Sequence, residues 1–203
     1  MKAVLNLQNN WKITKASVET LARIFLETVG LKESVQAIAE TIQKINSGDS
    51  STIATVTKAL QTYQGRFASN LSVYECHNII PRVLRYQLAT LLTGTAPAST
   101  FDANYIALGN GSGTPQPTDV KLVSETLRGT FSNRYRIDET AYFDKFFSTT
   151  EVQGMTFTEA GVFCDGTVTA DSGFLLSRIE MNESISANET LTFNAAITIT
   201  SAT

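Results

Sequence analysis

The segment Leu191-Thr-Phe-Asn-Ala-Ala-Ile-Thr-Ile-Thr200, close to the end of the 203-residue chain, alternates apolar and mostly polar side chains. Successive side chains of a β-strand point to opposite faces, so this period of two predicts a strand. The expected core face is formed by Leu191, Phe193, Ala195, Ile197 and Ile199. Thr192, Asn194, Thr198 and Thr200 are then expected on the opposite, solvated face.

Further strand candidates precede this segment in the second half of the chain. They are short apolar or aromatic runs separated by Gly, Asp and Asn turns, at residues 104–108, 134–137, 142–147, 157–163 and 174–181. Five or six short strands of this kind predict an antiparallel β-sandwich over residues 104–203.

The first half shows a different period. Apolar residues recur at spacings of three and four, which predicts helices over residues 11–29, 31–46, 53–63 and 81–93. The small, polar, Pro-containing segment 94–103 is typical of a linker. The fold class is therefore predicted to be α+β, with a helical assembly or anchor region (1–93), a linker (94–103) and an antiparallel β-sandwich (104–203).

Composition argues against several classes of protein. The net charge of −3 argues against a general nucleic-acid or anionic-membrane binder. Two Cys and one His argue against a disulfide scaffold and a Cys/His zinc site. No apolar run reaches about 18 residues, so no membrane span is expected, and the N-terminal sequence has no apolar core typical of a secretory signal.

Charge is unevenly divided along the chain. Residues 1–100 carry a net +4 and residues 101–203 a net −7. Opposite charge on two regions would favour head-to-tail packing of identical chains. The alternative is that two separate surfaces simply differ in composition.

Candidates for chemistry are few. His77 follows Cys76, but adjacent side chains point in different directions and rarely form a catalytic pair, so a loop or helix start with a small buried Cys is favoured. Cys164 is expected to be a second reduced thiol. The loop from Gly109 to Gly113 resembles the start of a phosphate loop, but no Gly-Lys-Ser/Thr follows, and its glycines are expected to permit positive φ. No catalytic, cofactor-binding or metal-binding residue is predicted.

Two further groups leave alternatives open. Asp138, Glu139 and Asp144 could perform acid–base chemistry on a sugar only if they met across a cleft, and a sheet surface or rim is favoured. Tyr135, Tyr142 and Phe143 are the aromatic candidates for a saccharide-binding groove.

The order of several short motifs over residues 78–200 resembles structural proteins of tailed bacteriophages and prophages, of the tail-, neck- and head-fibre group. A helix ending at Gly94 precedes Tyr105-Ile-Ala-Leu-Gly-Asn-Gly111, a Thr-Pro-x-Pro-Thr-Asp segment and Leu122-Val-Ser-Glu125 to Arg128. Glu159-Ala-Gly-Val-Phe163 and the segment from Gly173 through Leu175 to Arg178 follow.

This resemblance implies a non-enzymatic component of a phage particle (tail, neck or collar, baseplate or fibre), localised in the virion and made in the bacterial cytoplasm. The implied partners are copies of the chain itself, as a trimer or higher ring, and other virion proteins, with no cofactor, nucleic acid or membrane. The alternatives are a capsid decoration or cement protein, and a receptor- or carbohydrate-binding module at a fibre tip.

Overall fold

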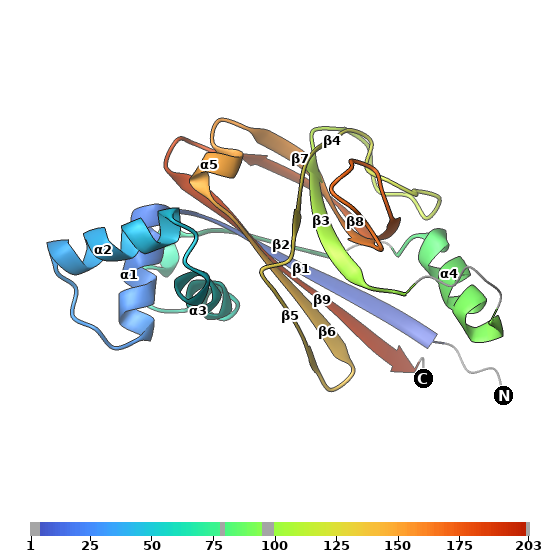
Figure 1. Ribbon diagram of the computed structural model, residues 1–203, viewed down its shortest axis with the longest axis horizontal. Helices are drawn as coiled ribbons and strands as arrows, with labels where there is room; N and C mark the ends of the chain where they lie inside the picture. The colour runs from blue at the N-terminus through green and yellow to red at the C-terminus, as the bar shows by residue number, and fades with distance from the viewer. Residues whose placement is uncertain (1–4, 78–79, 95–99, 202–203) are drawn as a thin grey trace.

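A computed structural model describes residues 5–77, 80–94 and 100–201, and it contains two antiparallel sheets that pack face to face (Figure 1). The first sheet has the order β2-β1-β9-β6-β5 and the second β4-β3-β7-β8. The strands of the first sheet are β1 (Leu5–Ser17), β2 (Ser72–His77), β5 (Asn133–Ile137), β6 (Thr140–Phe147) and β9 (Glu189–Ser201). Those of the second are β3 (Ala103–Gly109), β4 (Glu125–Thr130), β7 (Thr156–Cys164) and β8 (Phe174–Ser184). The α+β class is as predicted, but the two packed sheets are not confined to residues 104–203, because β1 and β2 come from the region 1–93 that was expected to be helical.

Helices lie at both ends of this sandwich. The helix α1 (Val18–Thr28) packs with α2 (Val35–Asn46) and α3 (Ser50–Leu60) at one end, and α4 (Arg82–Thr93) lies at the other (Figure 1). A 3-10 turn (Ala68–Asn70) precedes β2, and the short helix α5 (Thr149–Val152) follows β6. Residues 95–99 of the expected linker lie outside the described residues.

The predicted helix over residues 11–29 is wrong in its first part. Residues up to Ser17 form β1, which pairs with β2 on one side and along its whole length with β9 on the other. Trp11 and Ile13 are buried in the core, whereas Lys12 between them points to the other face, so a period of two is present there. The helix begins only at Val18, where the Ser17 side chain accepts a hydrogen bond from the Thr20 amide.

The segment around Cys76 is also not a loop or helix start. It is the edge strand β2, and its pairing with β1 brings residues from the first half of the chain into the same sheet as β9. The other predicted helices are present, but the one expected over 31–46 begins only at Val35 and the one expected over 53–63 runs from Ser50 to Leu60. Asp49 caps α3 through the Thr52 amide, and Gly94 ends α4 with a left-handed conformation at φ 65°.

The main core lies between the two sheets. Trp11 crosses it and donates a hydrogen bond from Nε1 to the Ser177 hydroxyl at 3.0 Å. Its ring meets Phe193 edge to face, and Phe193 meets Phe147 in the same way. A second core, under α1, α2 and α3, reaches the outer face of the first sheet through Phe146.

The final strand follows the predicted alternation with two differences. Leu191, Phe193, Ala195 and Ile197 face the core, but Ile199 is 48% exposed because it lies beyond the end of the opposing sheet's core residues. Thr192, expected on a solvated face, is buried because the helices cover that end of the sheet. Thr198 is half-buried and its hydroxyl shares a hydrogen bond with that of Thr140.

Phe193→Ala should lower the free energy of unfolding by about 3–5 kcal/mol, the usual effect of emptying a buried aromatic position. Thr198→Ala on the opposite face should lower it by only about 0.5–1.5 kcal/mol, for one hydrogen bond. Urea unfolding of both variants measures the difference. Equal and small losses would show that β9 is frayed or in another register.

Candidate functional site

The outer face of the five-stranded sheet carries a row of polar residues at one level. The strand register places Glu75, Lys12, Asn194, Asp144 and Asn133 side by side on β2, β1, β9, β6 and β5. All five strands therefore contribute a polar side chain at the edge of the area that α1, α2 and α3 cover.

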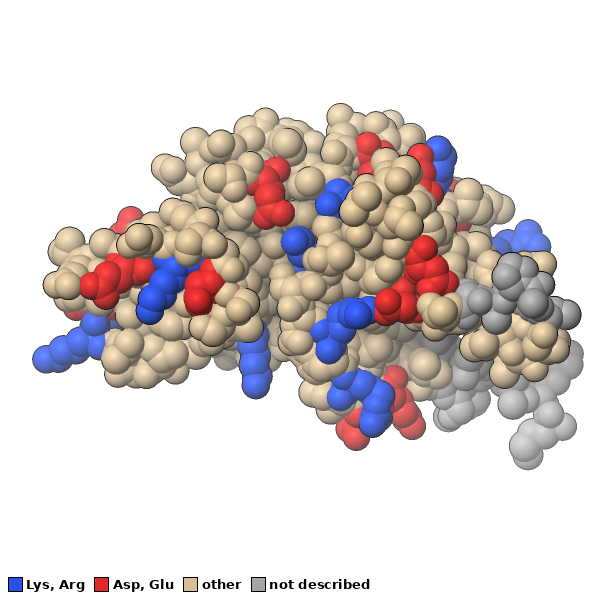
Figure 2. Space-filling view, in the orientation of Figure 1, with Lys and Arg blue, Asp and Glu red and all other residues tan. Residues whose placement is uncertain are grey.

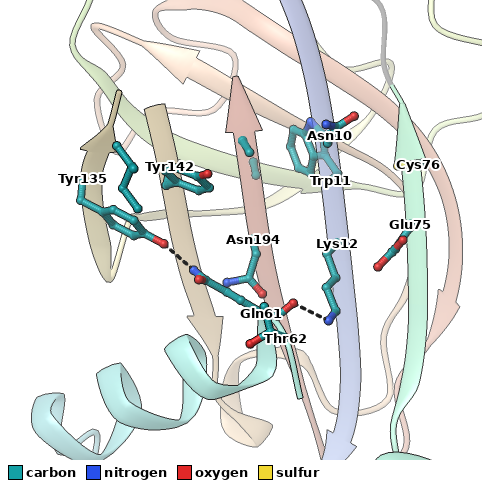
Figure 3. A pocket seen from close by; sticks show the side chains of 13 residues that line it. Asn10, Trp11, Lys12, Gln61, Thr62, Glu75, Cys76, Tyr135, Tyr142 and Asn194 are labelled. Carbon is teal, nitrogen blue, oxygen red and sulfur yellow. Dashed lines mark hydrogen bonds between the residues drawn. The ribbon is translucent and has the colours of Figure 1, made fainter. Parts of the chain in front are cut away.

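Gln61, the residue that follows α3, ties this row to the helices. Its Nε2 donates to the Tyr135 hydroxyl at 2.7 Å, and its backbone carbonyl oxygen accepts from Lys12 Nζ at 2.8 Å (Figure 3). The same Nε2 also donates to the Asp144 carboxylate at 3.1 Å. Asn194 Nδ2 also donates to Asp144, at 2.8 Å. The buried carboxylate is thus held by neutral amides, and the side chain of Asn133 adds a further hydrogen bond to it.

Asp144 is only 2% exposed, and burial raises its pKa above the ordinary value of 3.8. The hydrogen bonds from Asn194 and Gln61 act in the opposite direction because they favour the charged form. The carboxylate serves as an acceptor that fixes the two amides in place.

The next level of the sheet forms a hollow. There Tyr135, Tyr142, Ala196 and Asn10 lie side by side on β5, β6, β9 and β1. The two tyrosine rings stack with centroids 4.9 Å apart and planes 7° apart, whereas Ala196 has only a methyl group. The result is a pocket of about 520 Å³, also lined by Lys12, Gln61, Thr62, Glu75, Cys76, Ile137 and Asn194 (Figure 3).

The structure brings together only some of the predicted candidates. Tyr135 and Tyr142 line the pocket, but Phe143 points the other way into the sandwich core. Asp138 and Glu139 are exposed in the turn between β5 and β6, six and five residues along the chain from buried Asp144. At about 3.3 Å per residue the turn carboxylates and Asp144 do not meet across a cleft, so the suggested acid–base group is not assembled.

Both cysteines are free and poorly ionised. Burial raises the pKa of the Cys76 thiol to about 11 and that of Cys164 to about 12. A thiol acts as a nucleophile in its thiolate form, so neither side chain is primed for attack near neutral pH. The side chain of His77 lies outside the described part of the chain.

A second polar centre, absent from the predicted sites, links the motifs of the family resemblance. Glu159 on β7 pairs with Arg178 on β8 at 2.9 Å, and both side chains are at least 97% buried. Glu159 also accepts from the Val123 and Ser124 amides, at 3.0 and 2.8 Å. Its two oxygens therefore hold the far end of the loop between β3 and β4.

Arg178 holds the near part of the same loop. Its NH1 lies 2.6 Å from an Asp119 carboxylate oxygen, and its NH2 donates to the Gly113 carbonyl at 2.9 Å. Glycine is needed at positions 109 and 111 because Glu159 leaves no room for a side chain. An added Cβ would lie 2.7 Å from Glu159 Oε1 at Gly109 and 2.4 Å from it at Gly111. Only Gly113 among these loop glycines has positive φ, and no helix follows the loop to cradle a phosphate.

Glu125 and Arg128 form a comparable pair on β4. Arg128 binds Glu125 through two hydrogen bonds and fastens the loop between β7 and β8 through the Thr167 carbonyl and Ser172. Its guanidinium also lies over the ring of Phe163, 4.9 Å from the centroid. The charged residues Asp119, Glu125, Arg128, Glu159 and Arg178 of the loop and strand motifs thus hold loops onto the four-stranded sheet.

Within the described residues, no group of three or more His, Cys, Asp or Glu side chains is arranged to hold a metal ion. No helix among them has the length and apolar character needed to cross a membrane. Comparison of the chain with family models, with curated proteins and with solved structures gave no match.

Arg178→Met should lower the free energy of unfolding by about 3–5 kcal/mol, because it leaves the Glu159 carboxylate buried without its partner. Lys121→Met is the matched control: it breaks an exposed ion pair with Asp171 and should cost at most about 1 kcal/mol. Urea unfolding compares the two, and limited proteolysis should cut residues 110–124 faster in the Arg178 variant only. Similar small losses would contradict the assigned role of the buried pair.

The raised pKa of Asp144 predicts a pH-dependent difference in the free energy of unfolding between the wild-type chain and Asp144→Asn. A carboxyl group whose pKa is raised by folding binds its proton more tightly in the folded state, so it adds stability as the pH falls toward its ordinary pKa. The wild-type chain should therefore gain stability relative to Asp144→Asn between pH 7 and pH 4, as measured by urea unfolding at both. A constant or opposite difference would show that the hydrogen bonds outweigh burial.

Proposed function

We propose that this chain is a non-enzymatic structural component of a phage particle and that it assembles through protein–protein contacts. The proposal is supported by the structural role of the charged motif residues. Glu159, Arg178, Asp119, Glu125 and Arg128 are all engaged in holding loops onto one sheet. A motif set with this arrangement shapes a surface, and it offers no reactive group to a substrate.

The same motifs lie in one architectural unit. The segment Tyr105–Gly109 is in β3, Glu159 is in the neighbouring strand β7, and Arg178 is in β8 beside it. Segments separated by up to about seventy residues therefore meet in three adjacent strands. This arrangement supports the resemblance, because it gives the order of the motifs a common structural purpose.

Exposed apolar residues at the two ends of the molecule support self-assembly. In α4 only Leu84 is buried, whereas Tyr86, Leu91 and Leu92 are exposed, Leu92 by 79%. At the other end Leu31 and Val35 are exposed, Val35 by 89%. Figure 1 shows α4 and α2 at opposite ends of the long axis. Two different apolar patches so placed suit head-to-tail association of copies, which can close into a ring.

Charge is less important for this contact than the opposite net charges of residues 1–100 and 101–203 suggest. Residues 18–60, which contain α1, α2 and α3, carry four Lys or Arg against five Asp or Glu, so this end is nearly neutral. Figure 2 shows both signs interspersed over one face, with wide uncharged areas between them. The proposed contact between copies is therefore mainly apolar.

The test measures oligomer mass by light scattering after size-exclusion chromatography. The wild-type chain should form an oligomer of at least three copies, and Leu92→Glu and Val35→Glu should each reduce it to smaller species. Val168→Glu, at an apolar residue 82% exposed in the loop between β7 and β8, is the matched control and should leave the mass unchanged. Truncation of residues 1–77 is unsuitable because it would remove the central strand β1.

Membership of a particle is tested separately, by mass spectrometry of particles purified from bacteria that produce the chain. The chain should be present in several copies per particle. A monomeric wild-type chain that is also missing from purified particles would contradict the proposal.

A further inference from the structure

We propose that the pocket beside Tyr142 binds a neutral saccharide. This inference concerns the outer face of the five-stranded sheet and does not depend on the phage assignment, since it rests only on the pocket's shape, aromatic wall and charge. The pocket lies away from the motif loops of the four-stranded sheet.

The width of the hollow suits one flat ring. Tyr142 on β6 and Asn10 on β1 are separated by β9, which contributes only Ala196 at that level. Two strand spacings give about 9–10 Å between the flanking backbones. A flat ring in van der Waals contact on both sides needs about 7–8 Å between the atoms that enclose it. One sugar ring can therefore lie over the Ala196 methyl group.

The aromatic wall offers the apolar contact that a sugar ring needs. Tyr135 covers one side of Tyr142, and Gln61 fixes the Tyr135 hydroxyl from the end of α3. The pair of rings is thus held in place before any ligand arrives. The face of an aromatic ring is electronegative, and it attracts the polarised C–H groups on one face of a pyranose.

Polar groups surround the hollow on its other sides. Asn194 lines one side of the hollow, and its Nδ2 is bound to Asp144, which holds the amide in place. Thr62 and Glu75 add a hydroxyl and a carboxylate at the rim, so donors and acceptors are both available to a polyhydroxylated ligand.

Charge favours a neutral ligand over an anionic one. The two charged residues that line the pocket, Lys12 and Glu75, have opposite sign and lie opposite each other in the β1–β2 register. Lys12 already donates to the Gln61 backbone carbonyl, and Asp144 adds a second carboxylate within the polar row. A phosphate or carboxylate in the hollow would lie near two carboxylates with only one ammonium group to balance them.

The experiment uses the full chain on an array of oligosaccharides that includes neutral hexose and N-acetylhexosamine sequences together with sialylated and sulfated ones. The neutral oligosaccharide with the strongest signal is then titrated calorimetrically. Ala196→Leu fills the hollow and should weaken binding at least tenfold. Thr198→Leu, two residues along the same face of β9 and outside the pocket, should change it less than twofold, and Tyr142→Phe should retain binding because it keeps the ring.

Thermal unfolding of each variant checks that its fold is preserved. If Ala196→Leu unfolds, Ala196→Val provides the same block with a smaller side chain. Binding of neutral sugars that Ala196→Leu leaves unchanged would overturn the assignment of this pocket. Binding confined to the anionic sugars, or no binding at millimolar concentration, would overturn the proposed ligand class. None of these outcomes affects the oligomer measurement that tests the phage proposal.

Discussion

The antiparallel pairing of β1 with β9 is the constraint on which the other parts of the structure depend. It joins the start of the chain to its end along the full length of both strands. Trp11 and Phe193 come from these two strands and meet in the core, where Trp11 also binds Ser177 of the opposite sheet. The same pairing places α1 directly after a central strand, so α1, α2 and α3 must cover the outer face near its end. The uncovered remainder of that face becomes the pocket.

The sequence allowed the second half of the fold to be predicted better than the first. The strand at Leu191 is recognisable because one face is apolar over its length, whereas the alternation around Trp11 is interrupted by Asn9 and Asn10 and followed at once by a strong helical period from Val18. Local spacing could not reveal that β1 lies between β2 and β9, since pairing between residues 172 to 196 positions apart leaves no local signal. On either side of the Asn pair, residues 5–8 and 11–14 each keep the alternation of a strand.

The candidate site was predictable only in part for the same reason. Tyr135 and Tyr142 stand out as aromatic residues in adjacent strands of a hairpin, and their stacking follows from cross-strand pairing. Gln61 had no such signal, because its contact with Asp144 depends on α3 reaching the sheet. Asn194 meets Asp144 through the register of β6 and β9, which the sequence alone does not give. Glu159 and Arg178 were visible as motif residues, but their burial as an ion pair depends on the register of β7 and β8.

The two sheets share one core, but the side chains on their outer faces differ in kind. On the four-stranded sheet the charges are paired internally and fasten loops, while on the five-stranded sheet a row of polar side chains adjoins an open aromatic pocket. The exposed apolar residues of α4 and α2 lie at the ends of the molecule, so contacts made there leave the pocket accessible. A ring of copies would then present several identical pockets together. Because linked sites bind with an effective concentration set by their spacing, weak binding of one sugar per copy would become strong attachment to a surface that repeats the same sugar.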